Sequence, residues 1–199
     1  MKIIYIDIIA ILIAAGLFIH AVKRHGPTFA VLYWVNGLLF TLAREYFQIR
    51  FLQLYVYGDF ATSVAGVPLV AGLFWPAALY LAAIMPRVLG GPPFFARMTS
   101  PLLLPFMVVV VFVMGLLVNA LAFKTGYVNW AGNPVKHNST HADLTLLIYA
   151  IGGLFSLIWY RRIWASDWTA GRQLVGIVVG SPVLVFFQLL ALWPVTLTV

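Results

Sequence analysis

Long uninterrupted apolar stretches constrain the fold of this chain more than any other feature. Between Pro101 and Phe123 the only polar side chain is that of Asn119. Such a stretch matches the roughly 20 residues that a helix needs to cross the hydrocarbon core of a bilayer. Lipid cannot hydrogen bond a peptide group, so only helices and closed barrels span membranes. Residues 107–114 lack the alternating polarity of barrel strands, and the sequence therefore predicts transmembrane helices.

The composition extends this prediction to the whole chain. Hydrophobic residues make up 63% of its 199 residues and charged residues 9%, and the mean hydropathy is +1.02. In soluble domains about a quarter of the residues are charged. We therefore expect one integral membrane domain over residues 1–199, all-α in class and built as a polytopic bundle of about six transmembrane helices. The expected crossings are residues 3–22, 29–43, 60–85, 101–123, 142–160 and 174–198.

The basic residues indicate how the bundle is oriented. The net charge is +7, but Lys and Arg gather at the ends of apolar stretches, which points to membrane lipid as the partner and not to nucleic acid. The connections after the first, third and fifth helices carry seven Lys or Arg, and the opposite face carries five. The positive-inside rule then predicts both termini on the non-cytoplasmic side of a prokaryotic inner or plasma membrane. We interpret the N-terminal apolar stretch as a retained helix and not as a signal peptide.

The two longest connections fall on the same face of any six-helix bundle. They span residues 44–59 and 124–141 and hold most of the ionisable groups. Ionisable groups at membrane depth are costly, and each is a candidate for function. The carboxylates of the chain are Asp7, Glu45, Asp59, Asp143 and Asp167.

Glu45 and Asp59 flank an aromatic segment, residues 46–57, that is too polar to cross the bilayer. We expect this segment to lie half-buried at the membrane surface. Two interpretations stay open. The segment is an interfacial aromatic belt in which Glu45 pairs with Arg44 or Arg50, or its carboxylates serve a functional site.

His137 and His141 are four residues apart, with Asp143 just beyond. On one helical turn the two imidazoles would share a face and could hold a metal. The neighbouring Asn and Thr residues are typical of a turn and a helix N-cap, which favours two surface histidines. The chain has no cysteine, so disulfides and thiolate metal sites are excluded. We expect no metal and no cofactor.

A series of residues in the second connection and the third helix is similar to a known pattern. It consists of Glu45, Tyr-Val-Tyr-Gly at 55–58, Gly-Val-Pro-Leu at 66–69, and Trp75. The series resembles the carotenoid biosynthesis membrane family that includes bacterial carotenoid hydratases and the archaeal bisanhydrobacterioruberin hydratase. In that family a glutamate closes one helix, a loop ends in Tyr-x-Tyr, and Gly-Val-Pro-Leu leads to a tryptophan. Residues 126–134 are similar to a second family element.

The resemblance implies acid-catalysed hydration of a terminal alkene in a polyene, within carotenoid or isoprenoid lipid metabolism. Such a reaction needs a proton for one carbon, stabilisation of a tertiary carbocation at the other, and a water. A buried carboxylic acid can supply the proton, and aromatic faces can stabilise the cation. Either carboxylate is the implied acid, and either histidine is the group that orients water. The implied catalytic residues are Glu45, Asp59, His137 and His141, and the implied substrate-binding residues are Tyr55, Tyr57, Trp75 and Trp130.

Two other classes of function compete with an enzyme. The first is a non-catalytic small subunit of a respiratory or photosynthetic membrane complex that binds lipid, carotenoid or quinone. The abundance of aromatic residues, 16% of the chain, favours it. The second is a transporter, which predicts inverted repeats and matched intramembrane charges. The sequence has neither, so a transporter ranks last.

Overall fold

Six helices make up most of the structure, a computed structural model that describes residues 2–52, 55–58, 60, 62–88, 103–126, 128–130 and 139–197. Within these residues the prediction of an all-α protein with six helices is confirmed. The number of helices that cross a membrane stays a prediction. The helices are α1 Lys2–His25, α2 Pro27–Arg50, α3 Leu69–Val88, α4 Leu103–Thr125, α5 Ser139–Trp164 and α6 Ala170–Leu197.

Among the described residues, three helices are long and apolar enough, by length and composition, to cross a membrane. The qualifying stretches are Asp7–His25 in α1, Pro105–Ala122 in α4 and Ala170–Ala191 in α6. Helix α3 carries a shorter apolar stretch, Leu69–Met85. These stretches fit an integral membrane protein, in which apolar side chains on the outside of the bundle face lipid and not water.

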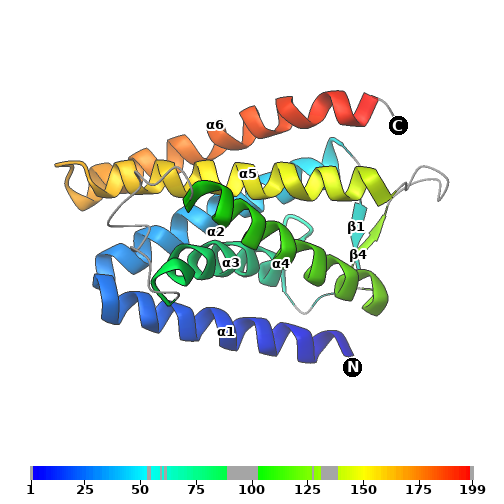
Figure 1. Ribbon diagram of the computed structural model, residues 1–199, viewed down its shortest axis with the longest axis horizontal. Helices are drawn as coiled ribbons and strands as arrows, with labels where there is room; N and C mark the ends of the chain where they lie inside the picture. The colour runs from blue at the N-terminus through cyan, green and yellow to red at the C-terminus, as the bar shows by residue number, and fades with distance from the viewer. Residues whose placement is uncertain are drawn as a thin grey trace.

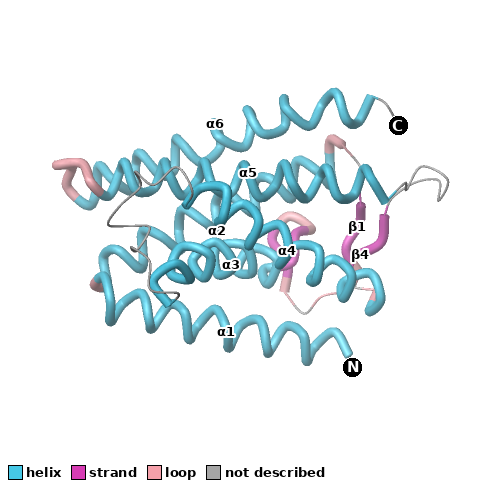
Figure 2. The backbone as a smooth tube through the Cα atoms, in the orientation of Figure 1, coloured by secondary structure: helices cyan, strands magenta, loops and turns pink. Residues whose placement is uncertain are grey.

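Helix α2 lies at the centre of the bundle (Figure 1). It packs against α1, α3 and α6 and, over a smaller area, against α5. Helix α4 packs on α3 and α5, and α1 and α6 lie on opposite outer sides. Figure 2 shows that helices run the length of the molecule, whereas the strands β1 and β4 are confined to one end.

Helix α2 continues to Arg50, well beyond its predicted end at residue 43. It begins at Pro27. Proline lacks a backbone N–H, and the first turn of a helix tolerates this because an N–H there has no acceptor within the helix. The prediction ended early because Arg44 and Glu45 lower the local hydropathy. Both side chains are buried among neighbouring elements, so tertiary packing and not apolarity sustains the last two turns.

Helix α3 begins at Leu69, whereas apolarity predicted a start at residue 60. The preceding residues form a hairpin of β2 (Ser63–Val64) and β3 (Val67–Pro68). At its tip Ala65 and Gly66 have φ angles of 54° and 84°, and two positive φ angles are what a type I′ turn requires. Short apolar stretches do not distinguish a hairpin from a helix, which explains the error.

A two-stranded ladder joins the two long connections. Strand β1 (Tyr55–Tyr57) runs antiparallel to β4 (Val128–Trp130), with Tyr55 opposite Trp130 and Tyr57 opposite Val128. The prediction that both connections lie at the same face of the bundle is confirmed. Residues 46–50 of the predicted half-buried segment 46–57 continue α2. Exposed and buried side chains both occur along the segment, as expected, since Phe51 and Val56 are exposed and Gln48 and Tyr55 are buried. Its place at the membrane surface stays a prediction.

A buried polar contact ties three helices together in the middle of the bundle. Asn36 of α2 donates from Nδ2 to Ser156 Oγ of α5 over 2.9 Å. Its Oδ1 accepts a hydrogen bond of 3.1 Å from Ser181 Oγ of α6. In apolar surroundings each group needs these partners, so the contact sets how the three helices align.

Candidate functional site

Glu45 lies near the C-terminal end of α2 and pairs with its sequence neighbour. Arg44 Nη2 donates to Glu45 Oε1 over 2.6 Å, and the side-chain exposures are 1% and 2%. The sequence suggested Arg44 or Arg50 as the ion-pair partner of Glu45, and the structure shows that it is Arg44. The pair is buried inside the bundle and does not lie at an open interface. Two opposite charges can be enclosed in this way only because each neutralises the other.

Two tyrosines of β1 also donate to the Glu45 carboxylate. Residues two apart in a strand face the same side, so Tyr55 and Tyr57 both reach it. The Tyr57 hydroxyl donates to Glu45 Oε2 over 2.8 Å, and the Tyr55 hydroxyl donates to the same oxygen. Burial, and then the charge of Glu45, raises the pKa of each tyrosine well above its ordinary value of 10.0. Both tyrosines therefore stay protonated and remain donors at neutral pH.

Arg44 lies between two aromatic rings. The centre of its guanidinium group is 4.8 Å from the ring centroid of Trp75 in α3 and 4.5 Å from that of Tyr149 in α5. A desolvated cation over an aromatic face gains about 2 kcal/mol or more. Rings from two other helices therefore hold the ion pair of α2 in place.

Gln48 completes the polar cluster on α2. It follows Glu45 by three residues, which places the two side chains on the same face of the helix. The Tyr55 hydroxyl lies 2.6 Å from Gln48 Oε1, while Gln48 Nε2 is buried without a hydrogen-bond partner among the described residues. We define Arg44, Glu45, Gln48, Tyr55 and Tyr57 as the Glu45 cluster.

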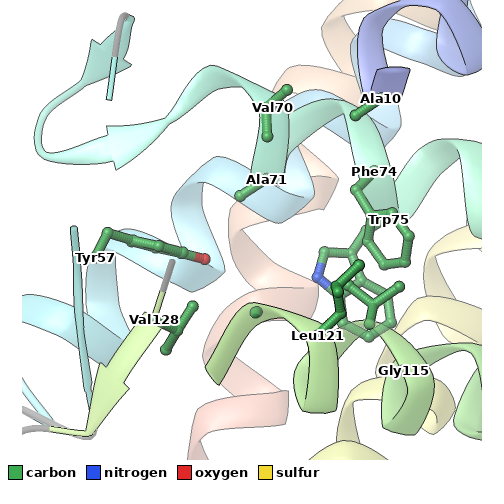
Figure 3. A pocket seen from close by; sticks show the side chains of 11 residues that line it. Ala10, Tyr57, Val70, Ala71, Phe74, Trp75, Gly115, Leu121 and Val128 are labelled. Atoms are coloured by element: carbon green, nitrogen blue, oxygen red, sulfur yellow. The ribbon is translucent and has the colours of Figure 1, made fainter. Parts of the chain in front are cut away.

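An apolar pocket of about 110 Å³ adjoins the Glu45 cluster (Figure 3). Tyr57 of β1 and Val128 of β4 line one side, with Phe74 and Trp75 of α3 and Leu121 of α4 across from them. An engineered apolar cavity of about 150 Å³ binds benzene. This pocket is smaller, so it has room for only the last few carbon atoms of an apolar chain.

Tyr57 and Trp75 belong to both the pocket and the surroundings of the ion pair. The Tyr57 ring lines the pocket while its hydroxyl donates to Glu45. Trp75 lines the same pocket while its ring contacts the guanidinium of Arg44. Among the described pocket-lining residues, Tyr57 carries the one side-chain hydroxyl. The Tyr57 hydroxyl thus connects the buried carboxylate of Glu45 to the apolar pocket.

The structure brings together four of the residues that the sequence singled out: Glu45, Tyr55, Tyr57 and Trp75. Trp130 pairs with Tyr55 in the ladder through the backbone. Asp59 and His137 lie outside the described residues. His141 lies in the first turn of α5, where the structure describes the backbone alone. The roles assigned to these residues stay predictions.

Sequence reasoning missed Gln48, Tyr149 and the pocket-lining residues of α4. The helical spacing of Thr41, Arg44 and Gln48 was a usable signal, because polar residues at such intervals share one face. No signal marked Tyr149, which lies more than a hundred residues along the chain from Arg44. Among the described residues no cluster of three or more His, Cys, Asp or Glu could hold a metal ion.

Comparisons with protein-family models, with curated proteins and with solved structures give no significant match for this chain. The fold and the site define it as an all-α, membrane-type helical bundle with a buried carboxylate beside an apolar pocket. Its function therefore has to be argued from this geometry.

Proposed function

We propose that the chain is a membrane enzyme that hydrates the terminal alkene of a polyene or related isoprenoid chain. One observation carries the proposal: Tyr57 lines the apolar pocket with its ring and contacts Glu45 with its hydroxyl. The reaction needs both an apolar space and a proton donor at its edge. The resemblance to carotenoid hydratases, which rests on Glu45 and the Tyr-Val-Tyr element among other residues, supports the same chemistry.

Glu45 is the proton carrier in this proposal. In its carboxylic acid form, which leaves the charge of Arg44 to the ring faces of Trp75 and Tyr149, it passes a proton to Tyr57 while Tyr57 passes its own hydroxyl proton to one alkene carbon. The other carbon becomes a tertiary cation, which the ring faces of Tyr57, Phe74 and Trp75 stabilise. Water adds to this cation, and its surplus proton returns to Glu45. Arg44 and the two tyrosines stabilise the carboxylate that is left after proton transfer.

The substrate end enters from the lipid. Helices α1 and α4 both pack on α3 and both contribute to the pocket, through Ala10 and Leu121 respectively. Leu121 is 53% exposed, so the pocket wall reaches the outer surface of the bundle. A polyene dissolved in the bilayer can present one end here while the rest of the chain stays in lipid.

Expression in cells that accumulate lycopene-type carotenoids tests the proposal. We expect pigments that gain the mass of one water, detected by mass spectrometry. Glu45→Gln should lower product formation by about 10²–10⁴-fold, the usual contribution of a general acid. Asp167→Asn is the matched control, because it removes an exposed carboxylate outside the site. A Glu45→Gln protein that folds and keeps full activity contradicts the proposal.

A non-catalytic polyene or quinone binder is the second candidate. The observation in its favour is that the described pocket-lining residues are hydrophobic, with polar atoms only in the Tyr57 hydroxyl and the Trp75 indole N–H, as expected for a site that only holds an apolar ligand. Purified protein would then show pigment or quinone absorption in fixed stoichiometry, with no hydrated product from added polyene. Replacing Glu45 would leave that absorption unchanged.

We further propose that the pocket end of the bundle, with both termini, faces the non-cytoplasmic side of a prokaryotic inner or plasma membrane. Arg44 is buried in an ion pair with Glu45, so it leaves four Lys or Arg at the pocket end against seven at the other. Exposed Lys23, Arg24, Arg162 and Arg172 belong to the more basic end, which the positive-inside rule assigns to the cytoplasm.

Single cysteines test this orientation, because the natural chain has none. Val56→Cys lies at the pocket end and Ala165→Cys at the opposite end, and both positions are exposed. In intact cells a membrane-impermeant maleimide should label Val56→Cys alone. Labelling of Ala165→Cys alone would mean the reverse orientation.

A further inference from the structure

Tyr55 contacts more hydrogen-bond acceptors than it has protons to give. Its hydroxyl lies within hydrogen-bond distance of both Glu45 Oε2 and Gln48 Oε1. A hydroxyl group carries one proton and can donate it to one acceptor at a time, while its oxygen can accept from another donor. One of the two contacts must therefore run in the opposite direction, with Tyr55 as the acceptor.

Two arrangements of protons satisfy this geometry. When Glu45 is a carboxylate, Tyr55 donates to Glu45, and Gln48 must turn its amide so that Nε2 donates to the Tyr55 oxygen. When Glu45 is a carboxylic acid, its hydroxyl donates to the Tyr55 oxygen, and Tyr55 donates to Gln48 Oε1. The oxygen and nitrogen of a glutamine amide have nearly the same shape, so the two orientations occupy the same space.

The unpartnered Gln48 Nε2 supports this reading. The Gln48 side chain is fully enclosed, and its Nε2 has no partner among the described residues when Oε1 faces Tyr55. A buried donor without an acceptor costs about 1–3 kcal/mol. Turning the amide gives Nε2 an acceptor at Tyr55, but only while Tyr55 gives its proton to Glu45. The preferred orientation of Gln48 therefore depends on the protonation state of Glu45.

We propose that Gln48 is a positioning residue whose amide turns over as Glu45 takes up or releases a proton. One proton binds at Glu45 Oε2 or leaves it, the hydroxyl of Tyr55 rotates, and no other bond forms or breaks. Gln48 thereby gives Tyr55 a partner in both states. The purpose of this arrangement rests on the role proposed for Glu45, since a proton carrier needs both states to be accessible.

The other groups that face Glu45 keep their roles in both states. Arg44 of α2 stays protonated and donates to Oε1, and Tyr57 of β1 donates to Oε2 until the reaction, when the Glu45 hydroxyl turns from Tyr55 to Tyr57. Tyr149 of α5 lies close to Glu45 and to Arg44 and is also a hydrogen-bonding neighbour of Tyr55, and α3 contributes the uncharged ring of Trp75. Among these neighbours Gln48 is the one amide, and its donor and acceptor are separate atoms that exchange places when it turns over.

Infrared difference spectroscopy of the purified protein over a pH series tests the proposal without any substrate. The carbonyl band of the protonated Glu45 carboxyl is assigned by its loss in Glu45→Gln. We expect a glutamine side-chain amide band to change in step with it, and that band to vanish in Gln48→Met. A wild-type protein in which no glutamine band follows the carboxyl band overturns the proposal.

A pair of variants shows whether Gln48 acts through Tyr55. In Gln48→Met, the state with a protonated Glu45 loses Gln48 Oε1, which accepts the Tyr55 proton. The state with a Glu45 carboxylate loses Gln48 Nε2, which donates to the Tyr55 oxygen. The carboxyl should then titrate at a lower pH than in the wild type, because a buried donor that loses its acceptor costs more than an oxygen that loses one of its donors. In a Tyr55→Phe background the same substitution should cause no shift. An equal shift in that background overturns the proposal.

These outcomes are independent of hydratase activity. A protein without turnover can still show the coupled titration, which would sink the proposed function and leave the inference standing. An active enzyme whose Gln48→Met variant titrates as wild type would sink the inference alone.

Discussion

Arg44 and Glu45 are consecutive in the sequence, and both side chains are buried. An enclosed ion pair contributes little net stability, but breaking it leaves a charge without compensation. We expect Arg44→Met to destabilise the protein by roughly 3–5 kcal/mol. The double variant with Glu45→Gln, which removes both charges, should lose less than this single variant. Thermal unfolding in detergent measures both, and a double variant less stable than Arg44→Met contradicts the argument.

Burial of Tyr55 and Tyr57 makes stability depend on alkaline pH. In the folded protein both pKa values lie well above 10.0, whereas in the unfolded chain they lie near 10. The folded state therefore holds its protons more tightly, and this contribution is fully present below about pH 10. It is lost as the pH rises through the folded pKa values.

Tyr55→Phe should weaken this alkaline loss, since the variant has one buried hydroxyl fewer to ionise on unfolding. Melting temperatures recorded from about pH 8 to pH 12 provide the measurement. Tyr46→Phe serves as the control, because Tyr46 lies at an exposed position of α2. Equal slopes for all three proteins above about pH 10 would contradict the expectation.

The candidate site could be predicted from the sequence only in part. Glu45, Tyr55, Tyr57 and Trp75 stood out because each is a chemically distinctive residue beside an apolar stretch. The enclosure of the ion pair could not be predicted, because it depends on Trp75 and Tyr149 from distant helices. A hydropathy average uses only neighbours in the sequence, so it counts every charged residue as exposed. It cannot show that partners from distant helices bury the charge.

Close approach of α2 and α3 depends on Gly37. A methyl group at this position would lie 2.5 Å from Pro76 Cβ, and proline is too rigid to move aside. We expect Gly37→Ala to destabilise the protein by about 1–3 kcal/mol, as overpacking of a core does. Gly16→Ala in α1 is the matched control, because nothing lies within 4 Å of the added methyl group. Equal melting temperatures for the two variants would sink the argument.

The β1–β4 ladder can be trapped by a disulfide. Val56 lies opposite Asn129, and directly opposed residues of antiparallel strands have Cα atoms about 4.5–5.5 Å apart, within reach of a disulfide. Val56→Cys with Asn129→Cys should cross-link within one molecule on mild oxidation. A shift in gel mobility that reductant reverses detects it.

The control for this cross-link pairs Val56→Cys with Ala165→Cys, which directly follows the C-terminal end of α5, and that end of α5 lies far from β1 (Figure 1). It should give no intramolecular link. If the control links as readily as the test pair, or the test pair fails to link, the two long connections are not paired as described.

At the scale of elements, the number and order of the helices followed from the apolar stretches, but their ends did not. Helix α2 extends to Arg50 because its polar side chains find partners inside the protein. Helix α3 begins at Leu69 because Ala65 and Gly66 form a tight turn before it. Side-chain partners decide where α2 ends, and turn geometry decides where α3 begins. A hydropathy average contains no information on either.

The molecule as a whole places the Glu45 cluster at one end, whereas the majority of its Lys and Arg belong, by their place in the sequence, to the other. Sequence alone predicted that the two long connections share a face, since an even number of helices separates them. It could not predict that residues of these two connections pair as strands. That pairing depends on contacts between segments more than seventy residues apart.

The central position of α2 also has a consequence for how the chain enters a membrane. α2 carries Asn36, Thr41, Arg44, Glu45 and Gln48, all buried. Alone in lipid these groups would cost several kcal/mol each, so α2 is a poor substrate for insertion by itself. Under the prediction that α2 crosses the bilayer, it becomes stable there only when α1, α3, α5 and α6 surround it. The helix around which the others pack should therefore be the last to settle during biogenesis, and its orientation depends on helices synthesised after it.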